Sequence, residues 1–392
     1  MFQLPQKELE QMGASITTKE IMQQPDLWQE AYKNFLEKED DISSFLNKVI
    51  ENADSKVKVI FTGAGTSEYV GNSICAYLQK YGNRQNFLFS SVATTDIVSA
   101  PNYYLFEEDT VILVSFARSG NSPESVASVN LANKLINNCY HLTITCAKDG
   151  ELAKMAKNDS RNFLMLMPEL SNDGGFAMTS SFTCMMLTAL LIFDQEHLNE
   201  NKATFVTQMC QIANDIINRE SELKTLINKP FNRLVYLGSG SLSGLTQEAQ
   251  LKILELTAGE IATVYDSSMG FRHGPKSFIN NDTLVFGFVN NNTYTRKYDL
   301  DVLEEIAGDQ IANSTIAISQ KGVENFSGAT FELNSELLLP DAYLAFPMIL
   351  LAQTIALFTS IKVNNLPDTP SKTGTVNRVV KGVKIHEYYK ED

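Results

Sequence analysis

The chain has 392 residues, of which 44% are hydrophobic and 20% charged, a composition typical of a globular enzyme. This length predicts two or three domains with sizeable cores. The formal net charge of −14 argues against a nucleic-acid-binding protein, which needs a basic surface to displace counterions. An acidic protein can still bind a small anion, because backbone N–H groups at a helix start hold phosphate.

The cysteines and the N-terminal residues indicate the cellular compartment. The five cysteines are odd in number and widely spaced, and none forms a C-x-x-C pair. This spacing predicts neither a disulfide framework nor a structural zinc site and favours a reducing compartment. No apolar stretch follows a basic N-terminus, so we expect no secretory signal and a cytoplasmic protein.

Residues 1–50 are predicted to form a helical N-terminal extension. Trp28, Phe35 and Phe45 recur with helical periodicity, and Thr17 and Glu20 have the spacing of a capping box. From residue 51 onward, short β-branched runs alternate with amphipathic stretches, which predicts βαβ units and parallel sheets. The clearest predicted strands are Val57–Thr62, Val111–Phe116, His141–Cys146, Leu234–Leu237, Thr283–Val289 and Ser314–Ile318.

The sequence also repeats itself. VIFTGAGTSEYVGNS, starting at Val59, and LVYLGSGSLSGLTQE, starting at Leu234, both run from a strand through a Gly-x-Gly turn into a helix. Two copies of one α/β fold explain this repeat. We predict a first domain at 51–205, a helical linker at 206–229, a second domain at 230–370 and a tail at 371–392.

One apolar segment has the length of a membrane span. Ala342–Ile361 contains no charged residue over twenty positions. It carries Pro347 and several polar side chains and stands alone near the end of a chain that otherwise reads as soluble. These features favour a helix buried in a domain core or a subunit contact, and we expect no membrane partner.

Two loops rich in glycine and hydroxyl groups each follow a predicted strand and open a helix: 63–67 (GAGTS) and 117–123 (ARSGNSP). At such junctions the free N–H groups and the helix dipole favour an anion, and serine hydroxyls add donors. Either loop alone also fits an ordinary βα turn. Together with Arg118, they predict a phosphate site at the carboxyl edge of the sheet.

Other glycine-rich motifs fit less well. A dinucleotide fingerprint needs glycine where Glu68 stands, and a P-loop needs a Gly-Lys-Ser/Thr sequence that is absent. The second-half counterpart of the serine loop, Val289–Thr293, lacks the Ser-Gly-x-Ser pattern. We therefore expect only the first half to hold phosphate and the second to contribute catalytic groups.

These loops resemble the signature of the sugar isomerase (SIS) domain, found in the isomerase half of glucosamine-6-phosphate synthase. Most of the chain is similar to bacterial double-SIS galactosamine-6-phosphate deaminase/isomerases, also called tagatose-6-phosphate ketose/aldose isomerases. The resemblance rests on SFARSGNSPES, SNDGGFAMTSSFT, the stretch from LKILELTAGEI to FRHGP, and NRVVKGV. It implies two tandem flavodoxin-like SIS domains, a sugar-phosphate partner, no cofactor or metal, and a homodimer or higher homo-oligomer with active sites at the subunit interface.

The resemblance also implies the substrate-binding residues, which are Gly65, Thr66, Ser67, Arg118, Ser119, Gly120, Ser122, Thr179 and Ser180. The three serines of the two loops would hold the phosphate, and Thr179 and Ser180 would face the sugar. Ala117 stands where the synthase has another serine and Arg118 where it has glutamine, so the individual donors stay open. The synthase's glutamine-hydrolysing domain has no counterpart in the sequence, which favours amine release.

Moving a carbonyl between C1 and C2 needs a base and a group that opens the sugar ring. Glu255 lies three residues after Lys252 and seven after Glu248, so these side chains share a helical face. Spacing alone fits a solvated stripe better, and the resemblance selects Glu255 as the base. It also implies that His273, in a Gly-Pro loop, opens the ring, reaching into the neighbouring subunit's site.

Lys381 in the tail matches a substrate-contacting lysine of the synthase. No residues have metal-ligand spacing, and this enolisation needs no metal.

The resemblance favours deamination of galactosamine 6-phosphate to tagatose 6-phosphate and ammonia. Isomerisation of tagatose 6-phosphate without ammonia and deamination of glucosamine 6-phosphate stay open, because epimers differ by one hydroxyl. A sugar-phosphate sensor would leave Glu255 and His273 unused, and the N-terminal extension is too acidic for a DNA-binding module.

Overall fold

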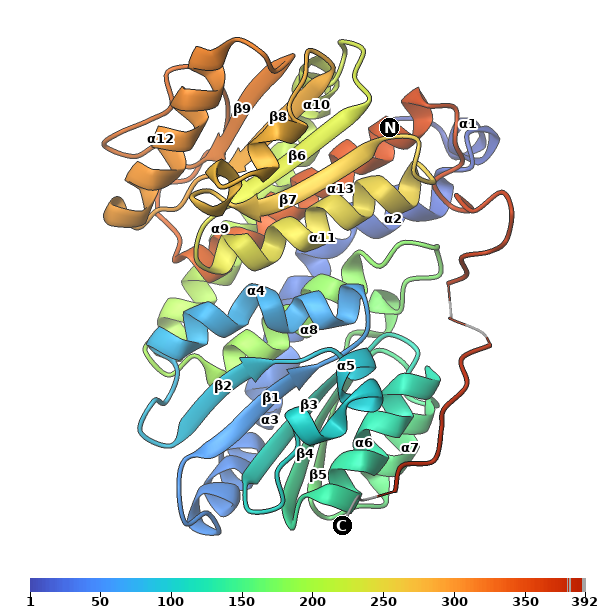
Figure 1. Ribbon diagram of the computed structural model, residues 1–392, viewed down its shortest axis with the longest axis vertical. Helices are drawn as coiled ribbons and strands as arrows, with labels where there is room; N and C mark the ends of the chain where they lie inside the picture. The colour runs from blue at the N-terminus through green and yellow to red at the C-terminus, as the bar shows by residue number, and fades with distance from the viewer. Residues whose placement is uncertain (379, 381, 390–392) are drawn as a thin grey trace.

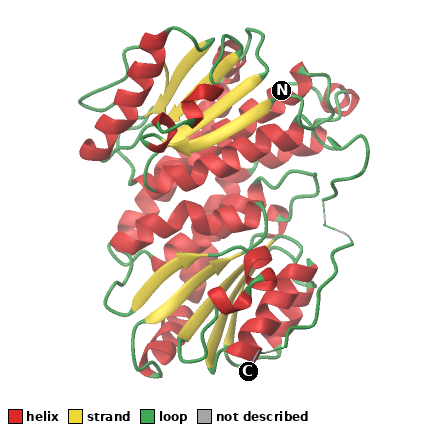
Figure 2. Ribbon diagram, viewed as in Figure 1, coloured by secondary structure: helices red, strands yellow, loops and turns green. Residues whose placement is uncertain are grey.

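The computed structural model describes residues 1–378, 380 and 382–389, and its two parallel sheets flank a layer of helices (Figures 1 and 2). The first sheet has the order β2-β1-β3-β4-β5, with β1 Val57–Thr62, β2 Phe87–Ser91, β3 Thr110–Ala117, β4 Asn138–Thr145 and β5 Asn162–Leu166. The second has the order β10-β9-β8-β6-β7, with β6 Arg233–Gly238, β7 Ala262–Ser267, β8 Thr283–Phe288, β9 Ser314–Ser319 and β10 Ala329–Glu332.

Both sheets follow one topology. Numbered within each half, the strands run 2-1-3-4-5, the flavodoxin-like order, and every pairing within the two sheets is parallel. The predicted α/β class with two tandem copies is therefore confirmed. We call the parts of the chain that carry β1–β5 and β6–β10 the first and second half.

The helices are α1 Gln6–Gln11, α2 Ser15–Met22, α3 Gln24–Glu51, α4 Thr66–Tyr81, α5 Thr94–Ser99, α6 Pro123–Leu135, α7 Glu151–Lys157, α8 Ser180–Phe193, α9 Asn199–Asn218, α10 Glu220–Leu226, α11 Ser241–Leu256, α12 Thr293–Asp309 and α13 Asp341–Lys362. Short 3₁₀ turns are η1 Pro101–Tyr103, η2 Glu169–Ser171, η3 Gly270–Arg272 and η4 Pro275–Phe278. Helices α4, α8, α11 and α13 lie between the sheets, and α5–α7 and α12 cover the outer faces (Figure 1).

Helices α4 and α11, which occupy equivalent places in the two halves, pack against each other. A side chain at Gly244 would place its Cβ 2.1 Å from the carbonyl oxygen of Asn72, so this close approach requires glycine. One helical turn away, the Asn72 side-chain amide donates to Gln247 Oε1 at 2.8 Å. Asn72 and Gln247 are 175 positions apart, the offset of the repeat, so the halves meet about a pseudo-twofold axis.

The apolar segment forms most of α13, and 94% of its most hydrophobic window is buried inside the protein. Its length and composition would allow it to span a membrane. It packs instead on α9 and α11, and Phe346 meets the ring of Trp28 from α3 edge-on, with centroids 5.6 Å apart. The expectation of a core helix is confirmed.

The predicted capping box at Thr17 and Glu20 is wrong. Helix α2 already begins at Ser15, so Thr17 lies inside its first turn. The free N–H groups of Ile16 and Thr17 are capped by the distant carboxylate of Asp368, at 3.0 and 2.8 Å. Glu20 turns away from the helix start and bonds to another loop, described below.

Candidate functional site

A cavity of about 100 Å³ lies at the carboxyl edge of the first sheet, between the loops that follow β1 and β3. Neighbouring connections leave the sheet in opposite directions there, which is where open α/β sheets bind ligands. The lining residues are Ala64, Ser67, Phe116, Ala117, Arg118, Ser119, Gly120, Ser122, Ser125, Met178, Arg378 and Val380.

Glycine shapes the loop after β1. Gly65 has φ +56° and ψ −127°, a conformation open almost only to glycine, and Gly240 repeats it in the second half with +58° and −127°. This turn brings the chain directly into α4, whose first residues are Thr66 and Ser67. The start of α4, which is the positive end of its helix dipole, therefore lies beside the cavity.

The loop after β3 supplies a second helix start. Gly120 has φ +65°, Ser122 is the N-cap of α6, and Pro123 occupies its first turn, as the sequence predicted. The hydroxyl oxygens of Ser122 and Ser125 are 2.5 Å apart at the cavity wall. Two helix N-termini and several hydroxyl groups thus converge on one small space, which can hold a dianionic ester.

Most, but not all, of the predicted binding residues meet here. Ser67, Arg118, Ser119, Gly120 and Ser122 line the cavity, and Gly65 and Thr66 belong to its first loop.

Thr179 and Ser180 do not reach the cavity in this structure. The Thr179 hydroxyl donates to Asp173 at 3.2 Å, and the Ser180 hydroxyl donates to the backbone oxygen of Glu20 at 2.8 Å. Asp173 also accepts from the N–H groups of Thr179, Ser180 and Ser181, because the buried start of α8 needs a cap.

Arg118 is buried and fastens the rim of the cavity. Its guanidinium donates to the backbone oxygens of Gly175 and Phe176 at 3.4 and 3.3 Å, and to that of Arg378 at 2.5 Å. Burial, and then the nearby Arg378 charge, lower the pKa of Arg118, while Asp173 and Glu255 act in the opposite direction. Arg118 therefore joins the loop after β3, the loop before α8 and the tail.

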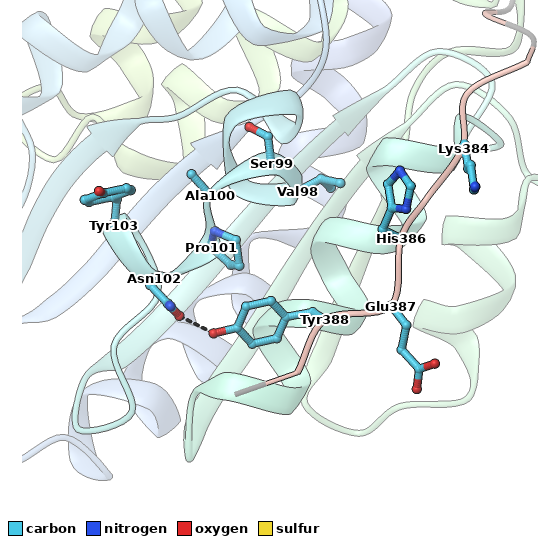
Figure 3. Close-up of a pocket in the computed structure, with 10 residues that line it drawn as sticks. All are labelled: Val98, Ser99, Ala100, Pro101, Asn102, Tyr103, Lys384, His386, Glu387 and Tyr388. Carbon is cyan, nitrogen blue, oxygen red and sulfur yellow. Dashed lines mark hydrogen bonds between the residues drawn. The ribbon is translucent and has the colours of Figure 1, made fainter. Parts of the chain in front are cut away.

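The tail crosses from the second half to the first along one side of the molecule (Figure 1). Arg378 donates to the backbone oxygen of Asp173 and, with Val380, lines the cavity. Further along, the Tyr388 hydroxyl donates to Asn102, enclosing a cavity of about 580 Å³ between the tail and Val98–Tyr103 (Figure 3). The smaller cavity is the candidate site, because the helix starts and serine hydroxyls meet there.

The predicted base comes to this site from the other half of the chain. The Lys252 ammonium lies 2.6 Å from Glu255 Oε2 and 3.3 Å from Glu248 Oε1, and it donates to the Thr66 hydroxyl at 3.0 Å. Lys252 and Glu248 are fully buried, whereas the Glu255 side chain is 23% exposed. Glu255 is therefore the solvent-accessible carboxylate of this cluster, one lysine away from the first loop.

Burial governs the charges in this cluster. It raises the pKa of Glu248 to about 8, with Lys252 opposing and Glu255 reinforcing the change. Burial also lowers the pKa of Lys252, but Glu248 and Glu255 more than offset it, and the pKa ends above its ordinary value. Near neutral pH, Lys252 is thus charged and Glu248 mostly holds a proton, which directs the lysine charge toward Glu255.

His273 follows η3 and is exposed, and it is not among the described residues that line the cavity. Its neighbour Arg272 pairs with Glu305 of α12 at 2.6 Å. Lys381 lies outside the described residues. Among the residues that are described, no group of three or more His, Cys, Asp or Glu side chains could hold a metal ion.

Comparison with known proteins decides the family. The SIS domain family matches residues 53–193. D-galactosamine-6-phosphate deaminase AgaS from Escherichia coli O157:H7 is 43% identical over 380 residues, which are 95% of this chain and 96% of that protein. The chain belongs to the AgaS family.

Two further comparisons also cover nearly the whole chain. D-galactosamine-6-phosphate deaminase AgaS from Shewanella sp. (strain ANA-3) is 38% identical and covers 99% of this chain and 96% of its own. The crystal structure of tagatose-6-phosphate ketose/aldose isomerase from Escherichia coli superposes with a TM-score of 0.87 at 39% identity, covering 95% of this chain and 97% of that one.

In this AgaS-family chain, the second-half junction is the place at the carboxyl edge of the second sheet that corresponds to the cavity of the first. A side chain of the protein occupies it. The Asp299 carboxylate of α12 accepts from the hydroxyls of Ser239 and Ser268 at 2.5 and 2.6 Å, and from the backbone and side chain of Asn290 at 3.0 and 2.9 Å. Ser239 and Asn290 follow β6 and β8, the counterparts of β1 and β3. An internal carboxylate thus takes the donors at this junction.

Sequence reasoning missed several residues of this site. Arg378 stands in the NRVVKGV motif, and that motif was the one signal that could have found it. Lys252 was recognised as a neighbour of Glu255, but its bond to Thr66 joins segments 186 residues apart. Ser125 and Met178 stand in the SFARSGNSPES and SNDGGFAMTSSFT motifs but were not selected as binding residues, because small and apolar residues occur in every loop and helix.

Proposed function

We propose that the protein removes the amino group of galactosamine 6-phosphate, giving tagatose 6-phosphate and ammonia. One observation carries the assignment to this site: Lys252 links Glu255 of the second half to Thr66 in the phosphate-binding loop of the first. Glu255 does not line the cavity itself, but Lys252 joins it to Thr66, the neighbour of the cavity residue Ser67, and this link supports Glu255 as the base. The names of relatives that share about two fifths of the sequence over nearly their full length support the substrate.

In the proposed site, the starts of α4 and α6, with Ser67, Ser119 and Ser122, hold the phosphate. Glu255 takes the proton from C2 of the open-chain amino sugar, forming an enolamine, and returns it to C1. The product is an imine at C2, and water hydrolyses it to the ketone and ammonia. Lys252, held between Glu255 and Thr66, fixes the base relative to the ester.

The remaining expected groups complete the proposal. His273 would open the sugar ring in the site of a neighbouring subunit, because its exposed loop does not line the cavity of its own chain. In this proposal the protein is a homodimer or higher homo-oligomer, and Lys381 contacts the sugar. We place the enzyme in the cytoplasm, where phosphorylated sugars are found.

An ammonia-release assay tests the proposal directly. The purified protein is given galactosamine 6-phosphate, glucosamine 6-phosphate and their N-acetyl forms, and ketose phosphate is measured in parallel. We expect equal amounts of ammonia and ketose phosphate from galactosamine 6-phosphate alone. Absence of ammonia with every amino sugar would refute deamination.

A second function has one observation in its favour. The Escherichia coli structure with a TM-score of 0.87 is named a tagatose-6-phosphate ketose/aldose isomerase. The same base and phosphate cavity would interconvert the aldose and ketose phosphates without an amine, because the proton transfer between C2 and C1 is the same. Conversion of tagatose 6-phosphate to an aldose phosphate, with no ammonia from amino sugars, would favour this reaction.

A further inference from the structure

The loop Gly174–Met178, which precedes α8, forms one wall of the phosphate cavity. Met178 lines the cavity, and its sulfur lies 3.9 Å from the Ser67 hydroxyl oxygen. The backbone oxygens of Gly175 and Phe176 accept from Arg118, which lines the cavity from the opposite loop. The position of this short loop therefore sets the position of Arg118.

A carboxylate of the N-terminal extension holds this loop. Glu20 of α2 is 7% exposed, and its Oε1 atom accepts from the backbone N–H groups of Gly174 and Gly175 at 2.6 and 3.1 Å. A Cβ atom at Gly175 would lie 2.9 Å from Glu20 Oε2. The glycine pair thus lets the backbone approach the carboxylate closely.

We propose that Glu20 is a positioning residue of the sugar-phosphate site, which fixes the Gly174–Gly175 turn and, through the carbonyl oxygens of Gly175 and Phe176, the guanidinium of Arg118. This inference rests on the proposed function for its kinetic consequences. It gives the N-terminal extension a role: α2 braces the cavity wall from outside the sheet, while Asp368, just before the tail, caps the same helix.

The charges around Glu20 make the brace sensitive to pH. Charged groups on the surrounding segments are Asp173 just before the braced loop, Arg118 just after β3, Asp368 just before the tail and Arg378 in the tail. Burial first, and then Asp173, raise the pKa of Glu20 to about 7, while the two glycine N–H groups and Arg118 oppose the change. Protonation below this pH weakens the acceptor that the glycines share.

Kinetics of two variants test the brace. Glu20→Ala removes the acceptor, and we expect KM for galactosamine 6-phosphate to rise about tenfold while kcat stays within about threefold, the cost of one charge-assisted hydrogen bond. Glu20→Gln keeps an acceptor oxygen and should recover most of the KM. Between pH 6 and 8, the KM of Glu20→Gln should lack the component that follows the titration of Glu20. Glu8→Ala, an exposed α1 carboxylate, is the control.

Hydrogen exchange tests the brace without using the reaction. In Glu20→Ala the amides of Gly174 and Gly175 should exchange at least about tenfold faster, whereas peptides from the second half should be unchanged. If Glu20→Ala does not fold, Gly175→Ala replaces it, because its Cβ forces the carboxylate away. Wild-type exchange or wild-type KM in the variant overturns the brace, whereas a wild-type protein that releases no ammonia refutes only the proposed function.

Discussion

The ammonium group of Lys252 in α11 donates to the hydroxyl of Thr66, the first residue of α4, across the helix layer that joins the two halves. The bond is 3.0 Å long, and it links the helix that carries Glu255 to the helix whose start faces the candidate cavity. The catalytic and the binding parts of the proposed site are thus connected through a single buried cation.

Removing this cation should destabilise the protein. Lys252→Met leaves the Glu248 carboxyl buried without its partner, and we expect a loss of about 3 kcal/mol in the free energy of unfolding. The double variant Lys252→Met/Glu248→Met replaces the unpartnered buried carboxyl by an apolar side chain and should regain most of the loss. Urea denaturation at neutral pH measures both. A double variant no more stable than the single one would contradict this account of the cluster.

Changing the proposed base should separate binding from chemistry. Glu255→Gln keeps the side-chain volume but cannot take a proton, so kcat for ammonia release should fall about 10²- to 10⁴-fold. The affinity for galactosamine 6-phosphate, measured by calorimetry, should stay within about threefold, because the ester is held by the other half. Glu260→Gln, an exposed carboxylate beyond the end of α11, serves as the matched control. Near-normal turnover in Glu255→Gln would exclude it as the base.

The serine loop should act on the ester and not on the sugar. Ser119→Ala removes a hydroxyl from the loop before α6, and we expect the dissociation constant for galactosamine 6-phosphate to rise about ten- to hundredfold. Binding of unphosphorylated galactosamine should be unaffected. Ser160→Ala, on an exposed turn, controls for loss of a serine hydroxyl elsewhere. An equal loss of affinity for both sugars would place the ester at another position.

Acid stability should depend on a buried histidine outside the site. His141 in β4 is 1% exposed, its Nε2 atom lies 2.9 Å from Asn133 Oδ1, and burial lowers its pKa to about 4. The folded chain keeps this ring neutral while the unfolded chain protonates near pH 6.5, so stability is lost as pH falls from 6.5 to 4. Over this range the loss amounts to about 3 kcal/mol. Urea melts across this range should show a smaller loss for His141→Gln, whereas exposed His386→Gln should match wild type.

One substitution should remove the carboxylate that occupies the second-half junction. Asp299→Ala leaves the donors of Ser239, Ser268 and Asn290 without their shared acceptor, at a cost of about 3 kcal/mol. Sulfate should then stabilise the variant more than it stabilises the wild type, because the anion can replace the carboxylate. Thermal melts in sulfate, with chloride at equal ionic strength as the reference, measure the difference. Equal gains in both proteins would show that the opened junction binds no anion.

The predicted strands show how far the sequence determines the fold. All six are central strands of the two sheets, β1, β3, β4, β6, β8 and β9. Central strands of a parallel sheet are buried on both faces and read as continuous apolar runs. The four strands not predicted, β2, β5, β7 and β10, are all edge strands. In β7 polar and apolar residues are mixed without alternation and every position is exposed or half-buried, so its sequence looks like a loop.

The site was predictable where its chemistry is local. Ser67, Ser119 and Ser122 lie in loops whose glycine and proline spacing indicates a helix start. The hydroxyls of Thr179 and Ser180 look equally available in sequence, but at the buried start of α8 they donate hydrogen bonds to Asp173 and to the backbone of Glu20.

Contacts between segments far apart in the chain were beyond the sequence. Glu20 and Gly174 are 154 positions apart, and Arg118 and Arg378 are 260 apart. No local pattern records such pairs, because each partner has an ordinary composition around it.

Asp299 has a consequence for stoichiometry. Although the fold is duplicated, the Asp299 carboxylate occupies the hydrogen-bond donors at the second-half junction. Each polypeptide should therefore bind one equivalent of sugar ester. The second half can then take another role, and in the proposed site it contributes Glu255 from α11. When one half of a duplicated protein fills its own ligand site in this way, it can supply side chains to the site of the other half.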